Sequence, residues 1–74
     1  MKLLTQLSPG HTARVAGVMQ DADRRLWDMG LVDGTLVECL FRSPLGDPTA
    51  YLVRGAVIAL RAKDAARVRI EAIT

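Results

Sequence analysis

The stretch from Arg24 to Thr35, "RRLWDMGLVDGT", decides the fold because it combines the end of a helix with two glycine turns. Ala22, Leu26 and Met29 recur at the i, i+4 and i+7 spacing that lines one face of a helix. This spacing predicts a short helix within residues 20–30, with Leu26 and Met29 packed in the core.

Polar residues and glycines mark where this helix begins and ends. Asp21 is a good N-cap candidate, and Asp23 lies where the helix dipole favours a negative charge. Gly30 is expected to end the helix in the left-handed region, with Leu31 folding back in a Schellman-type cap. Gly34 can then supply the positive φ of a tight turn into the next strand.

The residues before the helix predict a turn followed by a strand. Leu3–Gly10 is an N-terminal segment that ends in a Pro-Gly turn. His11–Met19 then alternates in the manner of a strand. Gly17 within this strand indicates a bulge or a close backbone approach.

The residues after the helix predict the rest of a small barrel. Thr35–Arg42 predicts a strand with Val37, Cys39 and Phe41 on one face. The remaining chain divides into a loop over Ser43–Pro48, a hairpin over Thr49–Arg61 broken at Gly55, a helical turn over Ala62–Arg67, and a strand over Val68–Ile73 with Val68, Ile70 and Ala72 on one face. Five short strands with a helix inserted after the first predict a mainly β fold, an SH3-like barrel.

Length and composition bound the class of protein. The 74 residues are expected to form a single domain, 1–74, with a small aliphatic core, since 50% are hydrophobic but only 4% are aromatic. The single cysteine excludes an internal disulfide and no stretch suits a membrane span, so we expect a cytoplasmic protein. The 10 basic and 8 acidic residues form no basic stripe, so no nucleic-acid partner is expected.

The patterns for catalysis and metal binding are weak. One His and one Cys without a third orienting group argue against an enzyme. His11 and Cys39 are weak candidates for a transition metal ion, although neither a CxxC nor an HxxxH pattern occurs. Single ligands could also come from Asp21, Asp23, Asp28 and Asp47. We assign no cofactor from this pattern and leave a transition metal ion open.

Trp27 is the most informative single residue. On a helical wheel it points away from the Leu26 and Met29 face, so it is either covered by another segment or exposed. An exposed Trp beside Arg24 and Arg25 is typical of a protein-interaction anchor, because Trp and Arg are enriched at binding hot spots.

Four motifs, in order and at the right spacing, carry a family resemblance: "LLTQLSPG" before a strand, "RRLWDMGLVDGT", "PLGDP" before the hairpin, and "GAVIALRAKDAARVRI". With them the chain resembles, nearly end to end, FeoA, the small cytosolic accessory of bacterial ferrous iron transport. The family commonly has Pro before the turn glycine, where this chain has Asp33, a residue that also suits a turn.

The resemblance implies an SH3-like barrel and a non-enzymatic module of iron homeostasis. It implies protein–protein contact on the cytoplasmic side of FeoB, the ferrous iron permease that carries a GTP-hydrolysing domain. The position of the contact is a hypothesis from the helix geometry and not from the family. It comprises Arg24, Arg25, Trp27, Gly30, Leu31 and Gly34.

Other classes of function stay open. The same barrel occurs as the C-terminal regulatory domain of iron-dependent repressors, although a chain that starts at Met1 without DNA-binding domains favours a stand-alone accessory. A transition-metal-binding protein is the third alternative, disfavoured by the missing ligand cluster. A weak homo-oligomer is compatible with each.

Overall fold

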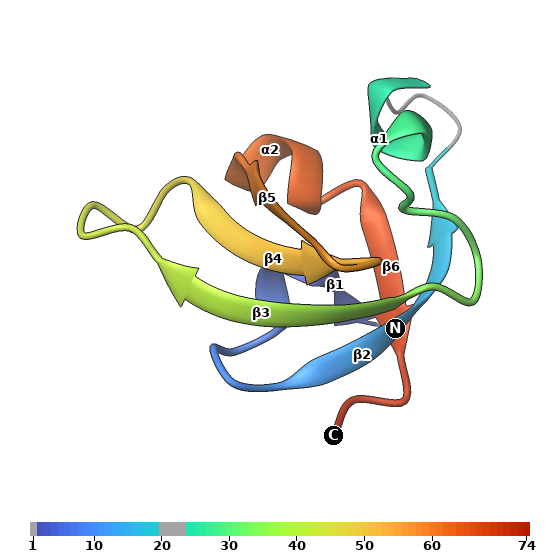
Figure 1. The fold of residues 1–74 in the computed structure, drawn as a ribbon, viewed down its shortest axis with the longest axis horizontal. Helices are drawn as coiled ribbons and strands as arrows, with labels where there is room; N and C mark the ends of the chain where they lie inside the picture. The colour runs from blue at the N-terminus through green and yellow to red at the C-terminus, as the bar shows by residue number, and fades with distance from the viewer. Residues whose placement is uncertain (1, 20–23) are drawn as a thin grey trace.

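The computed structural model describes residues 2–19 and 24–74, and within them the fold is mainly β (Figure 1). The described strands form one antiparallel sheet in the order β1-β6-β2-β3-β4-β5. The elements are β1 (Lys2–Leu3), the 3-10 turn η1 (Leu4–Gln6), β2 (Thr12–Val18), α1 (Arg24–Asp28), β3 (Leu36–Arg42), β4 (Thr49–Val53), β5 (Ala56–Leu60), α2 (Ala62–Ala65) and β6 (Val68–Glu71).

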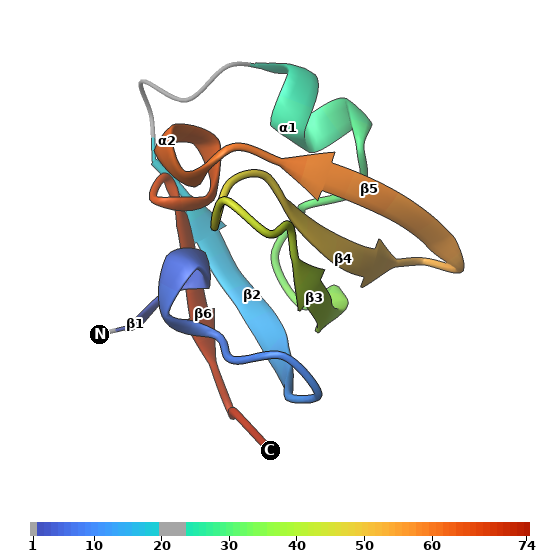
Figure 2. The ribbon, with the colours of Figure 1, turned by 90° about the vertical axis from the view of Figure 1, so that its left-hand side faces the viewer.

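The sheet curls into the predicted small barrel, and the two helices lie at the same end of it (Figure 2). An ion pair between Arg25 Nη2 of α1 and Asp64 Oδ2 of α2, 3.1 Å long, joins these helices. The predicted helix after the first long strand is confirmed over Arg24–Asp28. Ala22 and the predicted caps Asp21 and Asp23 lie outside the described residues.

The N-terminal segment contains a strand that the sequence did not predict. Lys2 pairs with Ile70 and Leu3 with Arg69, so β1 extends the sheet beyond β6. Leu4 and Leu7 then turn into the core, where both are fully buried. A strand of two residues is too short to show the alternation on which the prediction relied.

Gly17 carries both features expected of it. The β2–β6 register passes from Val15 opposite Ile70 to Gly17 opposite Arg69, so Ala16 is the extra residue of a bulge. A Cβ atom added at Gly17 would lie 2.7 Å from the Arg69 Nη2 atom, which is the expected close approach. The predicted strand is confirmed over Thr12–Val18.

The prediction that Phe41 shares the buried face of Val37 and Cys39 is wrong. Val37 and Cys39 are fully buried, whereas Phe41 is 59% exposed. The β3–β4 register shifts between Cys39 and Phe41, so a bulge reverses the faces of the strand beyond that point.

The last strand also ends earlier than predicted. It stops at Glu71, and Ala72 is exposed with a φ of 54° instead of sharing the buried face of Val68 and Ile70. This left-handed residue turns the chain away from β6, and Thr74 then exchanges backbone hydrogen bonds with Thr12 (2.8 and 3.1 Å).

The β4–β5 hairpin is confirmed, and its turn is tight. Val53 pairs with Ala56 across the two residues Arg54 and Gly55, whose φ values are 52° and 82°. Positive φ at both central residues matches a type I′ turn, whose twist suits a hairpin. The helical turn predicted over 62–67 is present as α2.

The core lies inside the curled sheet and is largely aliphatic. Leu26 is fully buried there, and Met29 packs against the cluster from the end of α1, as predicted. The buried residues are Leu4, Leu7, Ala13, Val15, Leu26, Leu31, Val37, Cys39, Tyr51, Val53, Leu60, Ala65, Val68 and Ile70. No helix in the described ranges is long and apolar enough to cross a membrane.

Candidate protein-interaction surface

A Schellman motif ends α1 as the sequence predicts. The Leu31 N–H donates to the Leu26 carbonyl (3.2 Å), and the Gly30 N–H donates to the Trp27 carbonyl (2.9 Å). Gly30 has the required positive φ, 95°. Leu26 and Leu31 are both fully buried, so their packing holds the end of the helix in place.

The next turn fastens this helix end to the sheet. The Thr35 N–H donates to the Val32 carbonyl (3.1 Å), closing a turn in which Gly34 has a φ of 88°. The Gly34 N–H donates to the Val15 carbonyl and the Val15 N–H donates to the Thr35 carbonyl, both at 2.8 Å. The segment from α1 to β3 is therefore tied to β2 by its own backbone.

The structure places Trp27 in solvent, which answers the question that the helical wheel left open. Its side chain is 60% exposed, and Arg24 and Arg25 beside it are exposed as well. Leu31 differs from the rest of the predicted contact set, because full burial removes it from direct contact and leaves it the role of shaping the turn.

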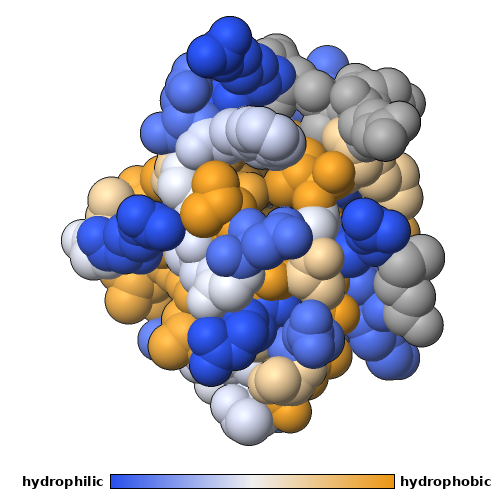
Figure 3. Space-filling model, turned by 90° about the vertical axis from the view of Figure 1, so that its right-hand side faces the viewer, coloured by the Kyte–Doolittle hydropathy of each residue, from blue (hydrophilic) through white to orange (hydrophobic). Residues whose placement is uncertain are grey.

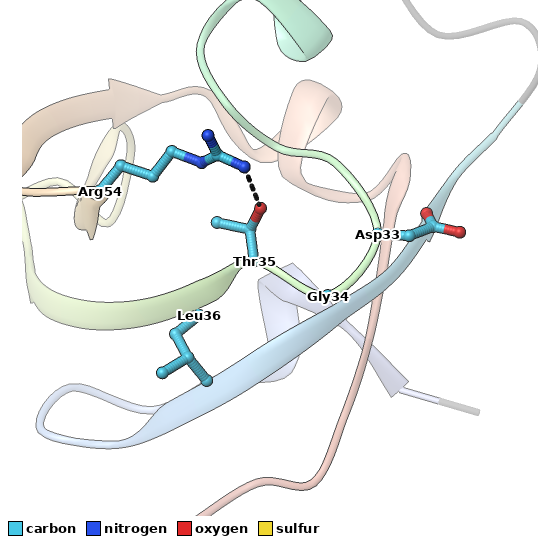
Figure 4. A pocket seen from close by; sticks show the side chains of 5 residues that line it. All are labelled: Asp33, Gly34, Thr35, Leu36 and Arg54. Atoms are coloured by element: carbon cyan, nitrogen blue, oxygen red, sulfur yellow. Dashed lines mark hydrogen bonds between the residues drawn. The ribbon is translucent and has the colours of Figure 1, made fainter.

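Adjoining depressions extend from Trp27 across the turn to the β4–β5 hairpin. The first, about 260 Å³, is lined by Trp27, Val32 and Asp33. The second is open, about 400 Å³, and lined by Asp33, Gly34, Thr35, Leu36 and Arg54 (Figure 4). The third, about 250 Å³, is lined by Thr12, Leu36, Val37, Glu38, Leu52, Arg54 and Gly55. We call the three together the groove, since each shares lining residues with the next.

The groove has a mixed apolar and charged surface. Leu36 is 55% exposed on it, which adds a second large apolar side chain to that of Trp27. Figure 3 views this side of the molecule and shows apolar residues, in orange, alternating with hydrophilic side chains in blue. The exposed Trp27 and Arg54 on it belong to residue types that are enriched at protein interfaces.

Two arginines hydrogen-bond to this turn: Arg54, which lines the groove, and Arg14 of β2. Arg14 Nη1 donates to the Gly34 carbonyl (2.9 Å), and Arg54 Nη2 donates to the Thr35 hydroxyl (3.3 Å). Both hydrogen bonds depend on the path of the backbone through the turn. The spacing of residues in the sequence does not predict that path. The signal available for Arg54 was its place before Gly55, where the hairpin turn fixes its direction.

The metal candidates His11 and Cys39 are joined by their backbones and not by their side chains. The Cys39 N–H donates to the His11 carbonyl (3.0 Å), but the thiol is buried in the core. The His11 ring is exposed, with Nδ1 3.1 Å from the Thr74 carbonyl. Within residues 2–19 and 24–74, His, Cys, Asp and Glu form no group of three or more able to hold a metal ion.

Burial also makes Cys39 a poor ligand or nucleophile. Removal from water raises the pKa of the Cys39 thiol above its ordinary value, and the positive charge of Arg42 only partly opposes this. Since the thiolate is the reactive and metal-binding form, the fold keeps this sulfur in its unreactive state.

Comparisons with known proteins agree with the fold. The FeoA of Chlorobium tepidum is 32% identical over 95% of this chain and 69% of its own, with a TM-score of 0.86. The iron(II) transport protein A of Clostridium thermocellum is 30% identical over 95% of this chain and 44% of its own, with a TM-score of 0.88. The FeoA of Stenotrophomonas maltophilia, a prokaryotic SH3 domain protein complexed with zinc, is 29% identical over 97% and 92%, with a TM-score of 0.85.

More distant structures share the fold alone. A manganese-dependent transcriptional repressor is 20% identical over 95% of this chain and 40% of its own, with a TM-score of 0.81. The IdeR protein of T. acidophilum is 24% identical, over 93% of this chain and 32% of its own, with a TM-score of 0.77. No curated protein sequence matches the chain.

These findings confirm the SH3-like barrel and the resemblance seen in the motifs. The sequence model of the FeoA domain matches residues 2–72, which is nearly the whole chain. The chain therefore belongs to the FeoA family.

Proposed function

We propose that this chain is a non-enzymatic accessory protein of ferrous iron uptake that binds the cytoplasmic side of a FeoB-type permease. Its membership of the FeoA family supports a role related to iron transport. The observation that carries the contact surface is Trp27, which is 60% exposed at the end of a helix locked by buried Leu26 and Leu31.

The physical case rests on an apolar anchor with charged neighbours on a fixed helix end. An aromatic side chain has few rotatable bonds, so it loses little conformational entropy on binding while it buries a large area. Arg24 and Arg25 beside Trp27 can then form the polar rim that surrounds such an anchor in protein interfaces. Gly30 and Gly34 contribute by fixing the two turns that present it.

A direct role for a metal ion has weaker support. One relative, from Stenotrophomonas maltophilia, was complexed with zinc. The described residues of this chain do not fit such an ion, because the Cys39 sulfur is buried in the core while the His11 ring is exposed to solvent. We therefore propose contact with a protein, and not resident metal chemistry, as the way this chain acts.

The regulatory-barrel alternative depends on the fold that the two repressor structures share with this chain. It predicts a partner within a transcriptional regulator in place of a permease. A chromosomal position beside a permease gene distinguishes the two, since an accessory protein is expected to be encoded with its transporter.

Calorimetry tests the proposal. The purified chain is titrated into the soluble GTP-hydrolysing domain and, separately, into the whole permease in lipid nanodiscs, with and without guanine nucleotide and ferrous iron. The proposal predicts saturable binding to the whole permease in at least one of these states. Absence of heat with both probes in every state would contradict it.

A further inference from the structure

Arg54 is held in a fixed direction on the groove. The type I′ turn sets its backbone, with a φ of 52°, and its side chain lies over Gly30 at the end of α1. Its Nη2 donates to the hydroxyl of Thr35, a buried residue that is only 8% exposed (Figure 4). The hydrogen bond and the contact with Gly30 restrict this exposed side chain, which lowers the entropy cost of binding a ligand.

The guanidinium still has most of its hydrogen-bonding capacity available. Arginine carries five N–H donors, and among the described residues the Thr35 hydroxyl is the one acceptor bonded to Arg54. Asp33 lines the same depression, but Figure 4 shows its carboxylate pointing away from Arg54. No ion pair with an acidic side chain of the described ranges neutralises Arg54.

Apolar side chains flank this charge on both sides. Toward α1, the depression at Asp33 continues to Val32 and the exposed Trp27. Toward the sheet, Arg54 and the half-exposed Leu36 line the next depression. The groove therefore presents the Arg54 charge between two apolar areas, and the carboxylates of Asp33 and Glu38 also lie on its lining.

We infer that the groove binds an extended segment of the partner that carries a carboxylate between apolar side chains, and that Arg54 binds this carboxylate. The inference rests on the proposed function, whose partner it refines to an acidic segment of the permease's cytoplasmic side. A planar guanidinium fork matches the two oxygens of a carboxylate and can bind both at once. The flanking apolar side chains contact Trp27 on one side and Leu36 on the other.

Two asparagine substitutions separate the charge from the fold. Arg54→Asn removes the guanidinium and creates an Asn-Gly pair, the dipeptide that type I′ turns favour, so the hairpin keeps its conformation. Arg61→Asn is the matched control. Arg61 is an exposed arginine beyond the other end of β5 at the N-cap of α2, a position that also favours Asn. Each variant loses one positive charge at a position where Asn is well tolerated.

The first measurement is binding of these variants to the permease in lipid nanodiscs by calorimetry. Arg54→Asn is expected to weaken binding about tenfold, whereas Arg61→Asn changes it less than about twofold. Arg54→Lys keeps the charge without the fork and is expected to lie between them. If Arg54→Asn bound the permease as tightly as the wild type while Trp27→Ala no longer bound it, this inference would be overturned. The proposed function would remain intact.

The second measurement identifies the carboxylate. Overlapping synthetic peptides that cover the cytoplasmic segments of the permease are tested for binding to the wild-type chain. The binding peptide is expected to contain Asp or Glu, and its amide variant should weaken binding to the wild type but not to Arg54→Asn. Equal losses with both chains would show that the carboxylate does not bind Arg54, and failure of the wild type to bind the peptides and the permease would overturn both proposals.

Discussion

Arg54 lies directly against Gly30, so closely that a Cβ atom added at Gly30 would come within 3.2 Å of the Arg54 Cδ atom. This contact joins two elements that are far apart in the sequence, the end of α1 and the turn between β4 and β5. The glycine that ends the helix thus also makes room for the arginine on the groove. Local capping and the shape of the candidate surface depend on the same residue.

Gly30→Ala is predicted to destabilise the chain and to displace Arg54. Forcing an alanine into a left-handed conformation costs about 1–2 kcal/mol in the free energy of unfolding. Gly34→Ala is the control, since Gly34 has a similar φ of 88° and an added Cβ would meet no atom within 4 Å. Both losses are measured by urea unfolding.

The two variants should differ at Arg54. The NMR signals of the Arg54 side chain are expected to shift in Gly30→Ala and to stay in place in Gly34→Ala. Unchanged Arg54 signals in both would show that the Gly30 contact does not position the arginine.

Gly17→Ala is predicted to destabilise the chain by about 1–3 kcal/mol, because a φ of 148° is a conformation essentially restricted to glycine. The added Cβ would also displace the Arg69 guanidinium. Because that group is the far end of a flexible side chain, Arg69→Ala should recover only a small part of the loss. A full recovery in the double variant would assign the cost to the contact instead of the backbone.

Trp27→Ala is predicted to leave stability nearly unchanged while it removes binding to the permease. The side chain is 60% exposed, and surface substitutions commonly change the free energy of unfolding by less than about 0.5 kcal/mol. Phe41→Ala is the control because Phe41 is exposed to the same extent, 59%, and is the penultimate residue of β3. The Phe41→Ala variant should retain both stability and binding. Equal loss of binding in the two variants would indicate non-specific hydrophobic binding by exposed aromatic side chains.

Stability is predicted to fall at alkaline pH. Burial raises the pKa of the Cys39 thiol, so the unfolded chain deprotonates first as the pH rises past the ordinary thiol value of 9.0. The stabilisation from the neutral thiol is therefore complete below that pH and decreases above it. Burial raises the pKa of Tyr51 as well, which extends the loss to higher pH.

Urea unfolding of the wild type and Cys39→Ala between about pH 7 and pH 10 measures this effect. The variant should be less stable at neutral pH, because it leaves a cavity, but its stability should change less with pH. Parallel curves for the two chains would exclude Cys39 as the source of the decline.

The features that the sequence predicted well are those set by local chemistry. Gly30 with Leu31 predicted the Schellman cap because the motif depends on residues within two turns of one another. Gly17 predicted the bulge for a similar reason, since a glycine inside an alternating segment has few other uses.

The features that were missed depend on pairing between distant segments. The exposure of Phe41 follows from a shift in register against β4, which the alternation within β3 does not contain. The strand β1 exists only because β6 offers it an edge. The position of Arg54 on the groove likewise depends on contacts with Gly30 and Thr35, which lie in the distant segment between α1 and β3.

The most direct test of the central claim is NMR mapping of the contact surface. The isotopically labelled chain is titrated with the permease in lipid nanodiscs, and the loss of each amide signal is followed. The account predicts that the first signals to broaden are those of Trp27, residues 30–36, Arg54 and Gly55. First losses on β1 and β6, with the groove unaffected, would contradict it.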